Sequence, residues 1–314
     1  MNPSVLTFAL WMFAGSALVP SGSRTADGIA PEPRSVPDTL ALAEYVGSEP
    51  CSGCHAAQRA SFTATEMGRV ILENPRNAVE RLGCEGCHGP GSRHIEASGE
   101  RVADFRTFNQ DDPTPVPERN AVCLQCHEGG LRMDWAGSQH DMRAVACTSC
   151  HSVMSPASEH GQLAKATVVE TCAQCHPREV RRQQMSLARM PVAEGKMDCT
   201  SCHNPHGTPN EKLLRAPSVN ETCTSCHAEK RGPFLWEHAP VVESCANCHD
   251  PHGSRNDKML VRPRPRLCQG CHINSRHPST PYTETARQVI GSQCQNCHVA
   301  IHGSNHPAGG RFVR

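Results

Sequence analysis

The 314-residue sequence has few of the large apolar side chains from which a protein core is normally built. Phe, Trp and Tyr together make up 4% of the residues, and hydrophobic residues reach only 37% even with the cysteines counted. Aromatic side chains bury the most area per residue. Their scarcity, alongside 24 Gly and 25 Pro, leaves too little apolar surface for an ordinary core. The sequence therefore predicts that another group fills the interior.

Net charge and long apolar runs are also lacking. The 31 basic residues balance the 31 acidic ones, so the formal net charge is zero. A nucleic-acid-binding protein normally carries an excess of positive charge on one face, so no nucleic-acid partner is expected. Beyond residue 20 there is no apolar stretch long enough to span a bilayer, which excludes a polytopic membrane protein.

Cysteine, in contrast, is abundant and occurs in one arrangement only. All 20 cysteines fall in Cys-x-x-Cys-His quintets, numbered 1 to 10 along the chain. The cysteine pairs are Cys51 and Cys54, Cys84 and Cys87, Cys123 and Cys126, Cys147 and Cys150, Cys172 and Cys175, Cys199 and Cys202, Cys223 and Cys226, Cys245 and Cys248, Cys268 and Cys271, and Cys294 and Cys297. The histidines that close the quintets are His55, His88, His127, His151, His176, His203, His227, His249, His272 and His298.

This spacing is the attachment signature of c-type haem. Two thiols form thioethers with the porphyrin, and the adjacent imidazole becomes the proximal iron ligand. A zinc site needs no His directly after the second Cys, and a disulfide framework would scatter its cysteines at varied spacings. The sequence therefore predicts ten covalent haem c groups, whose flat apolar surfaces supply the missing core. The propionates of these haems would suit the arginine-rich basic residues, for example Arg178, Arg181, Arg182 and the run Arg262, Arg264 and Arg266.

The N-terminal segment predicts export. Residues 5–19 form an apolar stretch of signal-peptide length, although the usual basic residues before it are missing; a retained anchor is the alternative. We expect a signal peptide over residues 1–26, a Pro-rich linker over 27–49, a first five-haem half over 50–190 and a second over 191–314. Export also fits the thiol chemistry that haem attachment requires.

An internal repeat indicates how the second half is organised. The sequence from Cys199 to Gly207 recurs from Cys245 to Gly253, giving a period of 46 residues and two haems per unit. Such repeats build extended objects whose units touch mainly their neighbours. The expected fold is a multihaem cytochrome c of short α-helices and loops, for example over residues 55–73. We expect it to be elongated, with a haem-filled core and little or no β structure.

A six-coordinate haem needs a second axial ligand. Nine histidines lie outside the quintets, and nine cannot serve ten irons: His94, His140, His160, His206, His238, His252, His277, His302 and His306. His206 and His252 each follow a proximal His by three residues. Three residues span at most roughly 10 Å, too little to pass around the same haem. We therefore expect both to bind neighbouring haems.

Three stretches carry a family resemblance: residues 217–240, the two Pro-His-Gly units, and the tail over 302–307. They make the chain resemble the periplasmic decahaem cytochromes of the MtrA/DmsE type, over residues 50–314. The resemblance implies an electron conduit that lies in the periplasm and outer membrane, inside a β-barrel porin. It also implies an extracellular multihaem cytochrome or terminal reductase as one partner, and a periplasmic or inner-membrane cytochrome as another.

The resemblance also implies a set of distal ligands, in which three methionines replace histidines of the family pattern. The implied set is Met67, His94, His140, Met154, Met190, His206, His238, His252, His277 and His302. It leaves His160 and His306 over, and His160 is an alternative to Met154. Thioether ligation raises the haem potential relative to two imidazoles. We hypothesise that the first-half haems sit higher in potential than in all-histidine relatives.

The leading interpretation is an electron carrier without catalytic residues, working in extracellular metal reduction or Fe(II) oxidation. One alternative is a multihaem oxidoreductase with one open iron, because the ligands are short by one histidine. The other is a periplasmic electron shuttle that never enters a porin.

Overall fold

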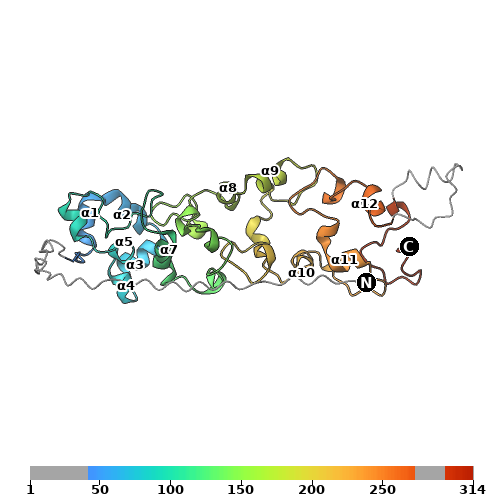
Figure 1. The fold of residues 1–314 in the computed structure, drawn as a ribbon, viewed down its shortest axis with the longest axis horizontal. Coiled ribbons are helices and arrows are strands. Elements are labelled where there is room, and N and C mark those ends of the chain that lie inside the picture. The colour runs from blue at the N-terminus through green and yellow to red at the C-terminus, as the bar shows by residue number, and fades with distance from the viewer. Residues whose placement is uncertain (1–41, 273–293, 314) are drawn as a thin grey trace, which may run out of the picture. The chain divides into compact units, whose positions relative to one another are not determined.

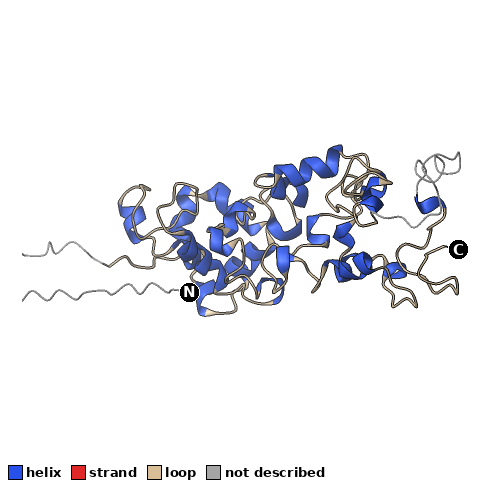
Figure 2. Cartoon of the chain, turned by 45° about the vertical axis from the view of Figure 1, so that its right-hand side comes forward, coloured by secondary structure: helices blue, strands red, loops and turns tan. Residues whose placement is uncertain are grey.

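The computed structural model describes residues 42–272 and 294–313, and within them the chain consists of short helices joined by loops and turns (Figures 1 and 2). The α-helices are α1 (Ser48–Cys54), α2 (Ala56–Thr63), α3 (Glu66–Glu73), α4 (Ala78–Arg81), α5 (Glu85–His88), α6 (Ser92–Glu96), α7 (Val116–Leu124), α8 (Val168–Ala173), α9 (Pro177–Met185), α10 (Val219–Thr224), α11 (Ala239–Glu243) and α12 (Arg266–Gln269). The 3-10 helices are η1 (Gly130–Arg132), η2 (Asp141–Arg143), η3 (Cys147–Ser149), η4 (His160–Gln162), η5 (Cys199–Ser201), η6 (Glu211–Leu213), η7 (Ala228–Lys230), η8 (Cys245–Asn247), η9 (Asp257–Met259) and η10 (Cys294–Asn296).

The prediction of short helices with little β structure is confirmed. Residues 42–272 and 294–313 contain five isolated β-bridges and no strand. The short helices predicted over residues 55–73 are present as α2 and α3, separated at Ala64 and Thr65. The break has a local cause, because the Thr65 side chain accepts a hydrogen bond from the Gly68 N–H and so caps the start of α3. No helix in the described residues has the length and apolarity needed to cross a membrane.

The chain divides into a unit of residues 1–42, of which only Leu42 is described, and a unit of residues 43–314. The predicted signal peptide over 1–26 and most of the predicted linker therefore lie outside the described residues. Helix α1 begins at Ser48, just before the predicted end of the linker. The division into halves at residues 190 and 191 stays a prediction.

The quintets fall into two alternating classes. The odd-numbered quintets lie at the ends of α-helices α1, α7, α8, α10 and α12. Their sequences carry helix-start signals: Thr167 and Glu170 form a reciprocal capping box before quintet 5, and Ser218 caps α10 before quintet 7. Of the even-numbered quintets, 4, 6, 8 and 10 begin with the 3-10 helices η3, η5, η8 and η10, and in quintet 2 the short helix α5 follows the first cysteine.

After quintets 4, 6 and 8 the chain turns back on itself. The proximal histidines of these quintets form antiparallel bridges with Leu163, Leu214 and Leu260. Left-handed residues make the turn possible, with φ of 55° at Lys212 and 54° at Lys258. Each turn therefore carries its own backbone back beside a proximal imidazole.

Candidate haem sites

The polypeptide has almost no apolar core of its own. Among the described residues the buried hydrophobic side chains are Phe62, Trp135, Leu213 and Leu260, and no side chain is fully buried. All 20 cysteines are free thiols, and each is exposed or half-buried. This is the arrangement that a covalently attached apolar group requires: open sulfur atoms around an interior that side chains do not fill.

The sulfur atoms of successive quintets lie near one another in a strict alternation. Between each odd-numbered quintet and the even-numbered quintet that follows it, the two first cysteines are close enough for their thiols to interact. These pairs are Cys51–Cys84, Cys123–Cys147, Cys172–Cys199, Cys223–Cys245 and Cys268–Cys294. Between each even-numbered quintet and the odd-numbered quintet that follows it, the two second cysteines lie close enough for their charges to interact. These pairs are Cys87–Cys126, Cys150–Cys175, Cys202–Cys226 and Cys248–Cys271. The thiols stand in for the thioether sulfurs of attached haem, so the attachment points follow one another in sequence order.

The predicted axial histidines meet in pairs. Each pair joins a proximal histidine to a histidine from outside the quintets, with ring centroids 6.0–6.3 Å apart. The pairs are His55–His94, His176–His140, His151–His206, His203–His252, His272–His238 and His249–His302. The two rings are within 14–19° of parallel in five pairs and tilted by 54° in His140–His176.

This separation fits one metal ion between two imidazoles. A metal–imidazole nitrogen bond is about 2.0 Å and the nitrogen lies about 1.1 Å from the ring centre, so two rings on opposite sides of one ion have centroids about 6.2 Å apart. Directly stacked aromatic rings prefer offset or edge-to-face contacts. The nearly parallel rings at this distance therefore leave room for an iron porphyrin, and the residues present fit the group.

Backbone carbonyls orient many of these imidazoles. The Nδ1 atom of each even-quintet histidine lies within hydrogen-bond distance of a carbonyl oxygen: His88 of Arg106 (2.6 Å), His151 of Gly161 (2.7 Å), His203 of Lys212 (2.8 Å), His249 of Lys258 (2.8 Å) and His298 of Arg311 (2.5 Å). A carbonyl has no proton to donate, so Nδ1 carries the hydrogen and Nε2 presents a lone pair to a metal. The sequence did not predict these carbonyl partners. The equivalent positions of Lys212 and Lys258 in the 46-residue repeat were a signal that could have found two of them.

Burial keeps the inward-facing histidines neutral. It lowers the pKa of His206 to about 4, with the neighbouring His151 adding to the effect. Burial is also the leading cause that lowers the pKa values of His238, His252 and His302. A histidine binds a metal only as the neutral imidazole. These sites therefore hold their side chains in the protonation state that iron ligation needs.

The other predicted ligands are not paired with a proximal histidine in the described residues. Met67 lies in α3, Met154 in the loop after quintet 4 and Met190 after α9, and all three are half-buried. No second imidazole stacks on His88, His127 or His227 within the described residues; His88 instead stacks on Phe105 at 5.3 Å. His160 is exposed in η4, and the Nδ1 of His306 accepts a hydrogen bond from the Ala308 N–H. His277 lies outside the described residues.

Two of the arginines predicted to suit haem propionates bind carboxylates of the chain itself. Arg182 pairs with Asp250, and Arg264 donates to Asp257 at 2.8 Å. Glu85, within quintet 2, has a similar structural role that the sequence did not reveal. Glu85 is 2% exposed, and its carboxylate accepts hydrogen bonds from the N–H groups of Val46, Gly47 and Gly91.

Three loops after quintets 6, 8 and 10, over residues 205–207, 251–253 and 301–303, each place a histidine followed by a glycine against an earlier segment. We name them the His-Gly loops. A Cβ at Gly207 would overlap the Asp134 carbonyl oxygen, and one at Gly303 would overlap the Phe234 ring. At Gly253 it would lie 2.8 Å from the Arg182 carbonyl oxygen. Glycine is therefore required for these loops to dock.

Gly207→Ala tests this docking. The added methyl would meet backbone that cannot rotate away, and φ at Gly207 is +121°, so we expect a loss of roughly 3 kcal/mol or more of stability. Gly137→Ala is the matched control, because Gly137 also has a positive φ but nothing within 4 Å of its Cβ position. It should lose only about 1–2 kcal/mol. Thermal unfolding of the two holoproteins, followed by circular dichroism, measures the difference; equal midpoints would contradict the docking.

Comparison with known proteins agrees with this chemistry. A family model described as "Doubled CXXCH motif" matches residues 190–232 and 238–277, "Cytochrome c-type protein NrfB-like" matches 84–175, and "Cytochrome c554 and c-prime" matches 35–89.

Among individual proteins, the multiheme cytochrome MtrA of Shewanella baltica is 40% identical over 272 residues, covering 84% of this chain and 80% of the relative. The cytochrome c-type protein NrfB of Escherichia coli is 25% identical, covering 58% of this chain and 88% of the relative. The polyheme cytochrome OmcB of Geobacter sulfurreducens is 24% identical, covering 58% of this chain and 25% of the relative. With attachment quintets of this kind and this degree of identity, the chain belongs to the MtrA-type multihaem c-type cytochromes, and it is an electron carrier on haem c rather than an enzyme.

Proposed function

We propose that this cytochrome is exported to the periplasm and carries electrons across the outer membrane, inside a β-barrel porin, along a row of ten haem c groups. One end exchanges electrons with a periplasmic or inner-membrane cytochrome. The other exchanges them with an extracellular multihaem cytochrome or terminal reductase. Haem supplies the reversible one-electron chemistry when bound. The polypeptide attaches, orients and spaces the sites.

The close succession of the quintets carries this proposal. Each quintet has a cysteine near enough to a cysteine of the next quintet for the two thiols to interact. A carrier that exchanged electrons at a single exposed site would need one haem and gain nothing from ten attachment points in a continuous row.

We infer two kinds of axial ligation in this row. The six histidine pairs, together with His277 on a seventh site, would give bis-histidine irons. Met67, Met154 and Met190 would complete the remaining three. Thioether ligands raise the potential, which would favour accepting electrons from an outside donor such as Fe(II). With all-histidine ligation the row would instead suit delivery of electrons to extracellular metal.

Proteoliposomes test transmembrane conduction directly. Vesicles that hold a reduced viologen dye are prepared with this cytochrome bound to its co-purified porin, and ferric citrate is added outside. We expect rapid oxidation of the enclosed dye, and none with porin alone. A cytochrome that neither co-purifies with a barrel protein nor oxidises the enclosed dye would be a periplasmic shuttle, and the proposal would be wrong.

A further inference from the structure

Five of the six paired histidines face a quintet two places away along the row; His94, which follows quintet 2, instead faces His55 of quintet 1. The histidines of the His-Gly loops after quintets 6, 8 and 10 face the proximal histidines of quintets 4, 6 and 8. Each therefore reaches two quintets back. His140 and His238, which follow quintets 3 and 7, face quintets 5 and 9. Each of these reaches two quintets forward.

Met190 follows quintet 5, between these two forward-reaching histidines. Its backbone occupies the same place in the fold as that of His238. Trp236, two residues before His238, bridges to Ser304, two residues after the histidine of its His-Gly loop. Ala188, two residues before Met190, bridges in the same way to Ser254, with N–H···O distances of 2.8 and 3.1 Å. His238 and Met190 therefore each lie two residues after an equivalent β-bridge.

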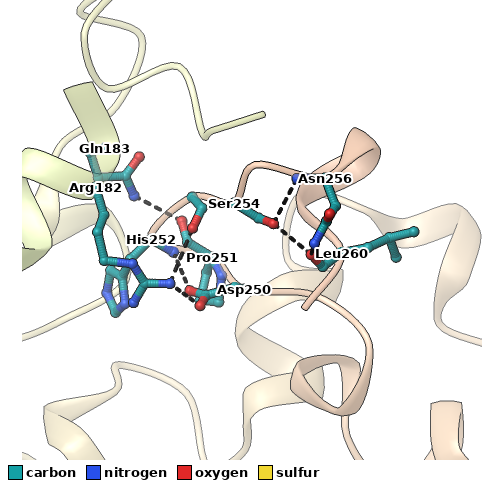
Figure 3. Close-up of polar contacts among 9 residues, drawn as sticks. Arg182, Gln183, Asp250, Pro251, His252, Ser254, Asn256 and Leu260 are labelled. Carbon is teal, nitrogen blue, oxygen red and sulfur yellow. Dashed lines mark hydrogen bonds and ion pairs between the residues drawn. The ribbon is translucent and has the colours of Figure 1, made fainter. Parts of the chain in front are cut away.

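The tight docking of the His-Gly loops supports the same equivalence. The Cβ positions of their glycines lie against Asp134, against Arg182 and Ser186, and against Phe234. These contacts fall four to eight residues before His140, Met190 and His238 respectively. Where the His-Gly loop over residues 251–253 docks, Arg182 also binds the carboxylate of Asp250 and donates to the Gly253 carbonyl, and these bonds hold the loop in place (Figure 3).

One hydrogen bond differs between the three places where a His-Gly loop docks. The difference follows from the replacement of a histidine by Met190 at one of them. The carbonyl before each loop histidine accepts from Nδ1 of the forward-reaching histidine: Pro205 from His140 at 2.7 Å and Ile301 from His238 at 3.0 Å. The Met190 side chain has no N–H to donate. At its junction the Pro251 carbonyl accepts instead from the side-chain amide of Gln183, at 2.8 Å (Figure 3).

We propose that Met190 is the distal ligand of the iron held by His227 in quintet 7, and that Gln183 is a positioning residue, replacing the missing imidazole N–H at the Pro251 carbonyl. The assignment rests on the proposed ligand set and specifies which iron the methionine serves. Met190 follows quintet 5, so an offset of two quintets forward, as for His140 and His238, places it at quintet 7. His227 also has no imidazole stacked on it among the described residues, which leaves its site open to a thioether. The same offsets assign Met154 to quintet 2 and Met67 to quintet 3.

The holoprotein of Met190→His tests the ligand. Thioether-ligated ferric haem has a near-infrared charge-transfer band and an electron paramagnetic resonance signal distinct from those of bis-histidine haem. With three His/Met sites, we expect Met190→His to remove about one third of the near-infrared intensity. The midpoint potential of one haem should fall as well. Unchanged intensity and unchanged potentials would overturn the assignment. Met185→His is the matched control, because Met185 lies nearby in α9 but is 72% exposed, and it should leave the spectrum as it is.

The double variant Met190→His/Gln183→Ala tests the role of Gln183. With the amide removed, the Pro251 carbonyl is free to accept from Nδ1 of the new histidine, and this hydrogen bond makes the imidazole a stronger donor to iron. We expect the potential of the affected haem to fall further than in Met190→His alone. A purely structural role for Gln183 would lower the thermal midpoint and leave that potential equal in the two variants. Both spectroscopic tests are independent of dye oxidation in vesicles, so the ligand assignment and transmembrane conduction can fail separately.

Discussion

Cys199→Ala/Cys202→Ala is expected to remove one haem from the middle of the row and to stop electron flow through the cytochrome. Quintet 6 is the structural link between its neighbours, because Cys199 is close enough to interact with Cys172 on one side, and Cys202 with Cys226 on the other. Without attached haem, electrons would have to cross the length of a whole site. The iron content should fall by one atom per polypeptide, and dye oxidation in vesicles should fall to the level of porin alone.

The single variant Cys199→Ala is the control for this experiment. Cys202 remains to attach the haem and His203 remains to bind the iron, so the iron content and the electron flow should both be retained. Equal flow through the double variant and the wild type would show that electrons bypass quintet 6. Electrons would then not pass through every haem in sequence order.

The sequence predicts the local parts of this structure well, because they depend on neighbouring residues. The quintets identify haem attachment by spacing alone. Short helices follow from the Pro and Gly content and from capping signals such as Thr167 and Glu170. Even the break between α2 and α3 has a local cause at Thr65.

Pairings between distant parts of the chain are harder to predict, because local spacing and composition do not specify which distant residues meet. The short reach of His206 shows that it must face another quintet, but not that its ring lies beside His151, 55 residues earlier. Gln183 carried no signal at all. Its role depends on the Pro251 carbonyl, 68 residues away, and on the absence of a side-chain N–H at Met190. Arg182 was a candidate for haem propionates, yet its partner is Asp250. The balance between such alternatives is decided by tertiary packing.

His252→Ala is expected to open one iron to external ligands. The imidazole of His252 faces His203 with a centroid separation of 6.1 Å, and it is held there by the His-Gly loop that Arg182 and Gln183 bind. Removing it leaves the iron of quintet 6 with His203 alone. We expect one haem in ten to become high-spin and to bind carbon monoxide when reduced, as followed by electron paramagnetic resonance and by carbon monoxide difference spectra.

His306→Ala is the matched control, because His306 is also a non-quintet histidine close to a His-Gly loop. Its Nδ1 accepts from the Ala308 N–H within its own turn, and its ring is not stacked on any proximal histidine within the described residues. The variant should stay fully low-spin and bind no carbon monoxide. Equal carbon monoxide binding by both variants would mean that the ring pairs do not mark axial ligands, since loss of a ligand and loss of a loop contact would then have the same effect. Binding by His252→Ala alone would connect the 6.1 Å separation of the rings to a coordinated iron between them.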